Sequence, residues 1–362
     1  MNKTNTILPD QAKFDQERQR LLATLGKLIE GGIVENLQHI GATSVPNLPP
    51  SPILDIGLSV IPFPLQPDHQ AALTELGYKI LPGYEGRPEQ RFRHFNGSIQ
   101  LLITEAGDDR WANYLLVRDY LRHSDSARRE YAERKAALSI SDDPTAKAQL
   151  FGPLITASHQ WWINRAGFEP VHTAAAELKD GGFAWYVSSG WALDLFLNQV
   201  CRVHLDIDVV VPRSDQLTIQ HHLTGRGWQL LTPMDGKLEP WPAHMRLEMP
   251  RHQVHAHRDD TFLDLLISQI EHGIWYYRRE PTIIRHMTQA TLMSEAGIPI
   301  LAPELVLLFK SQNTGKKDRG KDQLDFERVF PHLEPTRRAW LYWALQATDP
   351  NHDWLNWWPV AA

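Results

Sequence analysis

Two aspartates one residue apart, Asp206 and Asp208, stand at the start of a run that continues as Val209-Val210-Val211. Alternate side chains of a strand point to the same face, so this spacing predicts two carboxylates directed at one spot. Two such charges repel each other unless a cation lies between them, and hard oxygen ligands suit Mg²⁺ or Mn²⁺. The following valines are apolar on both faces, as in a buried strand, which argues against two acids that merely face water.

Small residues precede the two acids. Ser189 and Gly190 open the segment up to Asp194, whose composition is typical of a turn leading into a helix. With little or no side chain there, the main-chain N–H groups can approach a phosphate, which the helix dipole also attracts. We therefore expect a phosphate site beside the metal site. Arg202 and His204 are further candidates to contact a phosphate or to orient a carboxylate.

A small-residue turn followed by Asp-hydrophobic-Asp is the pattern of the nucleotidyltransferase superfamily. The stretches Gly190-Trp191-Ala192-Leu193-Asp194 and Arg202-Val203-His204-Leu205-Asp206-Ile207-Asp208 resemble the antibiotic nucleotidyltransferases that adenylylate aminoglycosides and lincosamides. One departure is that Ser189-Gly190 stands where that family usually has Gly-Gly. The superfamily tolerates this change because both residues are small.

Asp264 interrupts a second apolar run, Thr261 to Ile267. An ionised carboxylate buried there without a partner would cost several kcal/mol, on the order of the known penalty for burying charge. The resemblance implies a third carboxylate on a neighbouring strand that shares the metal and acts as general base toward a substrate hydroxyl, and Asp264 is the candidate. The alternative is an edge strand with Asp264 in water. His252, His255 and His257 precede this run, and their alternation fits either exposed strand histidines or a metal cluster.

A helix is expected from Pro303 through Lys310, because proline is favoured in the first helical turn. A basic loop and the sequence Lys321-Asp322-x-x-Asp325 follow. These features resemble the C-terminal helical part of related nucleotidyltransferases, where a lysine neutralises triphosphate charge. Lys310 is the candidate for that role, with Lys321 as the alternative.

The first half of the chain contains a similar order of features, which we interpret as a distant internal repeat. The run His39-Ile40-Gly41-x-Thr43-Ser44-Val45-Pro46-x-Leu48 resembles the GrpB family, which has a nucleotidyltransferase-like fold and no securely assigned activity. Further matches at Val117 to Arg122 and Arg129 to Lys135 extend the resemblance over residues 15 to 165.

A second site in the first half would contain His39, Gly41, Ser44 and Asp55. The position two after Asp55 is Gly57, so the paired acids are missing, and Ile99-Gln100-Leu101-Leu102 replaces the family's usual His-Leu-His strand. We therefore expect this half to be non-catalytic. These residues either line a ligand pocket or form a polar turn left over from an ancestral site.

Length and composition bound the remaining possibilities. The 362 residues suffice for two domains with their own cores, and the formal net charge of −6 gives no electrostatic reason to bind nucleic acid. The single cysteine, Cys201, excludes an internal disulfide. Because the sequence shows neither a signal peptide nor a membrane-spanning run, we expect a cytoplasmic protein with no membrane association.

These observations predict an α/β (α+β) protein of two nucleotidyltransferase-fold domains, each a small mixed sheet flanked by helices, with additional C-terminal helices. A GrpB-like domain spans residues 1–168, and a catalytic domain similar to aminoglycoside nucleotidyltransferases spans residues 169–362. The expected activity is Mg²⁺-dependent transfer of a nucleoside monophosphate, AMP from ATP or the equivalent from another nucleoside triphosphate, to a hydroxyl of a small molecule. Two alternatives stay open: a catalytically decayed regulator that binds a nucleotide or metabolite, and nucleotidyl transfer to a protein.

Overall fold

The computed structural model describes residues 10–29, 34–49, 51–60, 63–84, 86–105, 108–138, 144–204, 206–234, 237–258, 261–312 and 320–358. Contacts divide the chain into two units, Met1–Arg165 with Pro233–Pro240 and Ala166–Thr232 with Trp241–Ala362. We call these the N-terminal unit and the C-terminal unit.

The N-terminal unit is built on a five-stranded sheet in the order β1-β2-β5-β4-β3, in which β2 and β5 are parallel and the other neighbours antiparallel. The strands are β1 Val34–Ile40, β2 Leu54–Val60, β3 Tyr78–Ile80, β4 Glu89–His94 and β5 Ile99–Glu105. The helices are α1 Gln11–Ile29, α2 Pro67–Glu75, α3 Asp109–His123, α4 Asp125–Leu138, α5 Pro144–Ala166 and the short 3₁₀ turn η1 Ala42–Ser44.

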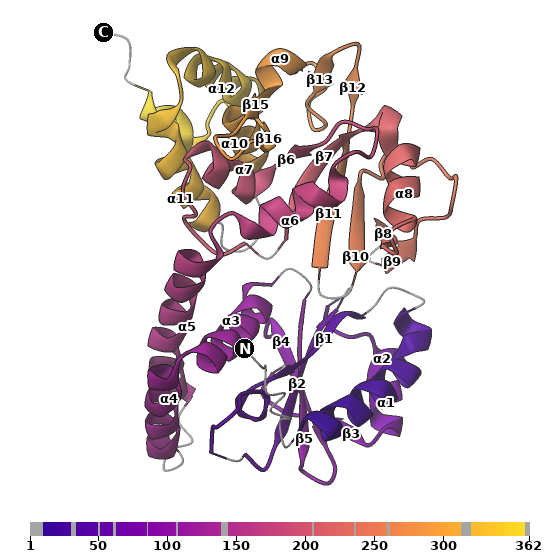
Figure 1. Ribbon diagram of the computed structural model, residues 1–362, viewed down its shortest axis with the longest axis vertical. Helices are drawn as coiled ribbons and strands as arrows, with labels where there is room; N and C mark the ends of the chain where they lie inside the picture. The colour runs from indigo at the N-terminus through magenta and orange to yellow at the C-terminus, as the bar shows by residue number, and fades with distance from the viewer. Residues whose placement is uncertain are drawn as a thin grey trace, which may run out of the picture. The chain divides into compact units, whose positions relative to one another are not determined.

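The two faces of this sheet differ because side chains alternate along each strand. Leu54, Ile56 and Leu58 of β2 pack with Leu21 and Leu25 of α1 in the main hydrophobic core. Figure 1 shows α1 and α2 on that side of the sheet and α3 on the other. The second face carries polar residues such as Asp55 and Gln100, and a smaller hydrophobic cluster, which includes Leu121, Tyr131 and Leu154, lies among η1, α3, α4 and α5.

The C-terminal unit contains most of an eight-stranded mixed sheet in the order β15-β16-β6-β7-β11-β10-β8-β9 and a small sheet in the order β12-β13-β14. The strands of these two sheets are β6 Tyr186–Val187, β7 Asp208–Pro212, β8 Gln229–Met234, β9 Lys237–Pro240, β10 Gln253–Arg258, β11 Thr261–Ser268, β12 Ile270–Glu271, β13 Ile274–Tyr276, β14 Ile284–His286, β15 Thr291–Met293 and β16 Pro299–Leu301. The helices and 3₁₀ turns are α6 Glu169–Leu178, α7 Ser189–Phe196, η2 Arg213–Asp215, α8 Gln216–Thr224, α9 Met287–Ala290, α10 Pro303–Ser311, α11 Gly320–Val329, η3 Phe330–His332, α12 Pro335–Thr348 and η4 Asp353–Trp357.

Apolar runs place β7 and β11 at the centre of the large sheet. Val209 and Val211 of β7 and Leu263 and Leu265 of β11 are all fully buried. β7 pairs with β6 in the antiparallel sense and with β11 in the parallel sense, so both of its edges are covered. The acids at the start of β7 and within β11 are therefore held by a rigid part of the sheet.

The C-terminal aromatic residues pack among the last helices. The Phe326 ring of α11 stacks on Trp354 with a centroid distance of 4.1 Å. Trp354 itself is buried, as expected for a packing role.

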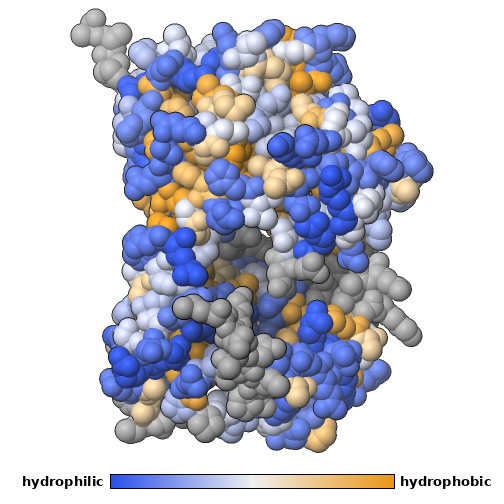
Figure 2. All heavy atoms as spheres, viewed as in Figure 1, coloured by the Kyte–Doolittle hydropathy of each residue, from blue (hydrophilic) through white to orange (hydrophobic). Residues whose placement is uncertain are grey.

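The visible face of the protein is largely hydrophilic, with hydrophobic residues in small groups (Figure 2). No helix within the described ranges is long and apolar enough to cross a membrane. The predicted fold class is confirmed, because the chain combines mixed sheets with flanking helices and ends in a helical segment.

Candidate active site

A tight connection links β6 to α7 at the start of the candidate site. The Ser188 N–H donates to the main-chain oxygen of Asp208 at 2.8 Å, which fixes the turn against the first residue of β7. Ser189 follows with φ of 52°, in the left-handed region that favours glycine. Glycine adopts this backbone geometry more readily than serine.

Gly190 cannot be replaced without moving its neighbours. A Cβ at this position would lie 2.3 Å from Arg202 Nη2 and 2.4 Å from His204 Cε1. The Arg202 and His204 side chains therefore lie directly against the start of α7. The glycine predicted to admit a phosphate also admits these two side chains.

His204 has a buried structural partner. Its Nε2 lies 2.7 Å from Asp194 Oδ2, and its ring packs on Trp191 with a centroid distance of 4.5 Å. Burial lowers the pKa of His204, although the hydrogen bond to Asp194 acts in the opposite direction. A neutral imidazole here orients the turn rather than supplying positive charge.

The three candidate acids lie on or beside two adjacent strands. Asp208 begins β7, and Asp264 of β11 is its direct parallel neighbour. Asp206 lies in the bend before β7, so the strand carries one of the two paired acids rather than both. The main-chain N–H of Asp264 donates to the oxygen of Ile207 at 3.0 Å, which extends the pairing toward Asp206.

The environment of Asp208 disfavours its charge. Burial, together with repulsion from Asp206, raises the pKa of Asp208 to about 7. A hydrogen bond from the Ser189 side chain and the charges of Lys310 and Arg202 act in the opposite direction. The site therefore contains two mutually repelling carboxylates, which a cation would relieve.

Asp264 is 6% exposed on an internal strand, so the alternative of an edge strand in water is wrong. Gln253 Nε2 of β10 donates to Asp264 Oδ2, and His255 lies opposite Asp264 across the β10–β11 pair. His255 is buried, so the interpretation of exposed strand histidines is wrong at this position. The sequence did not identify Gln253 as part of the site.

The donor set fits a hard divalent cation through Asp206 and Asp208. Mg²⁺ usually binds one or two carboxylates and completes its shell with waters and substrate phosphates. Within the described part of the chain, however, no group of three or more His, Cys, Asp or Glu is arranged to hold a metal ion. The expected three-acid set is therefore not assembled, because Gln253 engages Asp264 and Asp206 lies outside the strand.

A buried ion-pair network supports the turn from the C-terminal helices. Arg202 donates Nε and Nη2 to the two carboxylate oxygens of Asp325 on α11, at 3.2 and 3.1 Å. Lys310 Nζ of α10 lies 2.7 Å from Asp322 Oδ1 and 2.9 Å from Asp325 Oδ2. The two candidate phosphate-binding cations thus share Asp325, for which no role was predicted from the sequence beyond its place in the Lys321-Asp322-x-x-Asp325 motif.

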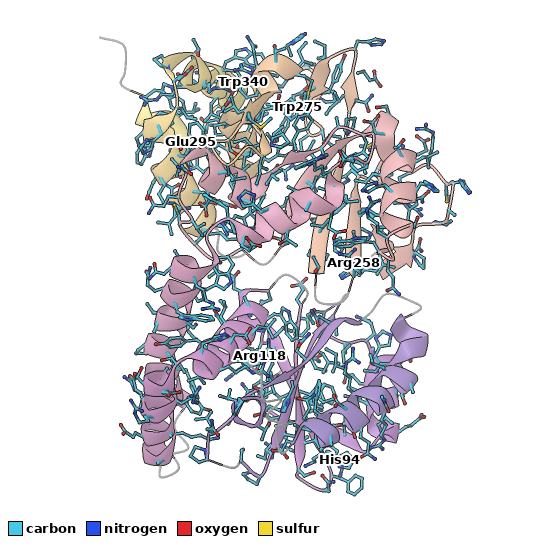
Figure 3. All side chains as sticks on the ribbon, in the orientation of Figure 1. His94, Arg118, Arg258, Trp275, Glu295 and Trp340 are labelled. Atoms are coloured by element: carbon cyan, nitrogen blue, oxygen red, sulfur yellow. The ribbon has the colours of Figure 1, made fainter. Side chains whose placement is uncertain are left out.

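The N-terminal candidates do not form one cluster of side chains, because His39 and Asp55 lie on opposite faces of the sheet. His39 is buried and stacks on Phe14, and Ser44 is fully buried with Oγ donating to the Gly41 carbonyl at 2.6 Å. Arg118 of α3, labelled in Figure 3, donates Nη1 to the main-chain oxygen of His39 at 3.2 Å. His39 and Ser44 therefore hold the turn in place, whereas Asp55 lies on the opposite face of the sheet from His39.

Gly41 and Asp55 are in direct contact. Gly41 has φ of 69°, and a Cβ there would lie 2.4 Å from Asp55 Oδ2. Ile40 precedes the Gly41 turn and pairs with Asp55. In the same way, Ser188 precedes Ser189 and is hydrogen-bonded to Asp208. By this register Asp55 corresponds to Asp208, so the missing acid is two residues before Asp55 and not at Gly57 as the sequence comparison assumed.

Comparison with known families defines two classes of protein in tandem. Residues 9–148 match the family model of the GrpB protein, and residues 170–329 match that of the aminoglycoside-2''-adenylyltransferase. The predicted tandem of these two families is confirmed.

Particular relatives are similar to parts of the chain. UPF0157 protein YqkA of Bacillus subtilis is 30% identical over 129 residues, 35% of this chain and 36% of the relative. UPF0157 protein SCO7215 of Streptomyces coelicolor is 32% identical over 123 residues, 34% of this chain and 62% of the relative. The chain thus spans less than two thirds of the length of these curated relatives.

Solved structures with similarity include the GrpB protein of Enterococcus faecalis, at 21% identity over 41% of this chain and 93% of that one, with a TM-score of 0.36. The antibiotic-resistance factor ANT(2'')-Ia matches at 14% identity over 50% of this chain and 91% of that one, with a TM-score of 0.37. The lincosamide adenylyltransferase LnuA, bound to lincomycin, matches at 15% identity over 45% of this chain and 95% of that one, with a TM-score of 0.34.

Proposed function

We propose that the C-terminal unit transfers a nucleoside monophosphate, AMP from ATP in the first instance, to a hydroxyl group of a small molecule. The observation that carries this proposal is the pairing of Asp208 with Asp264 beside Asp206 and the Ser189–Gly190 turn. The match of residues 170–329 to an adenylyltransferase family supports the same chemistry.

Each residue has a distinct role in the proposed reaction. Asp206 and Asp208 would hold Mg²⁺ or Mn²⁺, which would supply positive charge for the phosphates of the nucleotide. The main-chain N–H groups at Ser189 and Gly190 seat the phosphates at the N-terminus of α7. Asp264 accepts the proton of the acceptor hydroxyl. The hydroxyl oxygen then bonds to the α-phosphorus as the bond between that phosphorus and pyrophosphate breaks.

The strand order supports an approach of the two substrates from opposite sides of β7. The phosphate-seating turn follows β6, on one side of β7, whereas Asp264 lies on β11, on the other side. An in-line displacement places the attacking and leaving oxygens on opposite sides of the phosphorus. The acceptor therefore approaches from the β11 side, where Gln253 and His255 border Asp264.

Positive charge at the site comes from Arg202 and Lys310. Both act electrostatically on Asp208, and both are held by Asp325. Preorganised charges of this kind stabilise negative charge without rearranging during the reaction. We assign them to the triphosphate, with His204 orienting the turn through Asp194.

The test is transfer of label from ATP labelled at the α-phosphate to a panel of aminoglycosides, lincosamides and other polyols, with Mg²⁺ present. We expect a labelled product and equimolar pyrophosphate, with at least a hundredfold loss in Asp264→Asn, as for removal of a general base. Asp353→Asn, an exposed acid of η4, is the matched control and should be fully active.

Two outcomes would favour the alternatives. Nucleotide binding without release of pyrophosphate from ATP, whichever acceptor is present, would favour a decayed regulator. The N-terminal unit, which has Asp55 but lacks the second acid of the pair, is the observation that motivates this alternative. Label recovered on protein after incubation with lysate, and on none of the small molecules, would favour a protein acceptor.

A further inference from the structure

The N-terminal unit repeats the strand arrangement of the candidate active site with different side chains. Asp55 of β2 is the parallel neighbour of Gln100 on β5, as Asp208 of β7 is the parallel neighbour of Asp264 on β11. The next strand is antiparallel in both cases, and it places Arg93 opposite Gln100 where the C-terminal unit has His255 opposite Asp264. The amide of Gln100 thus stands where the C-terminal unit has the carboxylate of Asp264. The guanidinium of Arg93 stands where that unit has the imidazole of His255.

Hydrogen bonds join these three side chains into one row. Arg93 Nη2 donates to Gln100 Oε1, and Gln100 Nε2 donates to Asp55 Oδ1 at 3.4 Å. Arg93 Nη1 donates to the main-chain oxygen of Gly97 at 3.5 Å. These two hydrogen bonds of Arg93 go to neutral groups, and it reaches Asp55 through Gln100.

Two further cations lie near the same row. Arg91 of β4 and Lys135 of α4 both act electrostatically on Asp55, as does Arg93. Arg91 is ion-paired with Glu89, whereas Lys135 lies over the Tyr131 ring at 5.8 Å and is exposed. Around the Asp55 carboxylate, positive charge from three side chains outweighs negative charge from two.

Such a surface favours an anion. A lone carboxylate surrounded by cations needs no metal ion to relieve repulsion, because the fixed side chains already supply the positive charge. Arginine suits phosphate in particular, since its planar N–H groups bond to two oxygens at once. The turn at Gly41 lies against Asp55 and brings main-chain groups to the same place.

We propose that the N-terminal unit binds a small molecule bearing a phosphate group on this polar face of its sheet, through Arg91, Arg93 and Lys135, without a divalent metal ion. The proposal stands on these residues alone and does not depend on the activity proposed for the C-terminal unit. It gives the Asp55 region a binding role in place of catalysis.

The test uses the full chain carrying Asp206→Asn and Asp208→Asn, in EDTA, so that a metal-dependent site in the C-terminal unit does not contribute. Inorganic phosphate, pyrophosphate and ATP are titrated by isothermal calorimetry. We expect saturable binding of at least one of them, weakened about tenfold or more by Arg93→Gln, as for loss of a charged hydrogen bond. Lys135→Gln should weaken binding several-fold.

A matched control lies on the same helix as Lys135. Arg134 is ion-paired with Glu130, so Arg134→Gln removes one positive charge from α4 without touching the row and should change affinity less than twofold. Asp55→Asn removes the repelling carboxylate and should tighten binding. Asp208→Asn, by contrast, should weaken metal-dependent nucleotide binding. Removing the carboxylate should therefore raise affinity in the N-terminal unit and lower it in the C-terminal unit.

Two results would overturn the proposal. One is the absence of saturable binding by all three probes at millimolar concentration. The other is an affinity that stays within twofold of that of the Asp206→Asn/Asp208→Asn parent in both Arg93→Gln and Lys135→Gln. Circular dichroism checks that each variant is folded, and if Arg93→Gln is not, Lys135→Gln decides, because that side chain is exposed.

Discussion

Asp208 and Asp264 are direct neighbours across the parallel strands β7 and β11, with the N–H of Asp264 bonded to the residue before Asp208 at 3.0 Å. The strands that carry them continue with buried apolar residues, Val209 in β7 and Leu265 in β11. The carboxylates therefore keep a fixed relation to each other. A proton acceptor held beside a metal-binding acid is the arrangement that the proposed transfer needs.

Gln253→Ala should lower kcat about tenfold while leaving KM for ATP within about twofold, because Gln253 orients Asp264 without contacting the nucleotide. Steady-state kinetics of pyrophosphate release measure this effect. Gln229→Ala, at an exposed position of β8, is the control and should leave both constants unchanged. A Gln253→Ala enzyme with wild-type kcat would show that this hydrogen bond does not position the base.

Gly190→Ala should destabilise the C-terminal unit by about 1–3 kcal/mol, because the added Cβ forces Arg202 and His204 aside. Urea denaturation measures the loss. Gly152→Ala in α5 is the matched substitution, since nothing lies within 4 Å of its Cβ, and it should be neutral or stabilising. Equal stability of Gly190→Ala and wild type would mean that the close packing around the turn is not maintained in solution.

Asp325→Asn should cost about 3 kcal/mol of stability, because it leaves Arg202 and Lys310 without their shared buried carboxylate. Nucleotide affinity should change as well, since both cations would be released from their present geometry. Glu327→Gln, an exposed acid on the same helix, provides the control. Thermal unfolding compares the two, and a loss no larger than that of the control contradicts the network's structural role.

His39 should make the protein less stable as the pH falls. Burial, followed by the charges of Arg122 and Arg118, lowers the pKa of His39 to about 4. Between about pH 6.5, the ordinary value, and pH 4 the unfolded state binds the proton and the folded state does not, so the free energy of unfolding decreases on acidification. At pH 5 the loss amounts to about 2 kcal/mol.

The contribution of His39 is isolated by comparing urea denaturation of wild type and His39→Gln at pH 7.5 and pH 5. The variant should lose less stability on acidification, whereas His172→Gln, at an exposed position, should behave as wild type. Identical losses in wild type and His39→Gln would exclude a buried neutral imidazole.

The local features of the site could be predicted from the sequence because they depend on short-range periodicity. An acid followed by three valines predicts a buried strand, and two small residues before an apolar segment predict a helix start. The α7 turn and β7 appear at those positions, although β7 begins at Asp208 and leaves Asp206 in the preceding bend.

The remaining features depend on contacts between distant parts of the chain. Arg202 and Asp325 are 123 residues apart, and no local pattern pairs them. The row of Asp55, Gln100 and Arg93 requires the register of three strands, and a one-residue shift would turn each side chain to the other face. For this reason the sequence alone predicted the missing acid at Gly57 rather than two residues before Asp55.

The most direct test of the account is calorimetric titration of ATP into the full chain with and without Mg²⁺, for wild type and for Asp206→Asn/Asp208→Asn. We expect a Mg²⁺-dependent binding event in wild type that the double variant loses, with circular dichroism showing that the variant is folded. Equal Mg²⁺-dependent affinity in the two proteins would contradict the assignment of these acids to the metal–nucleotide site.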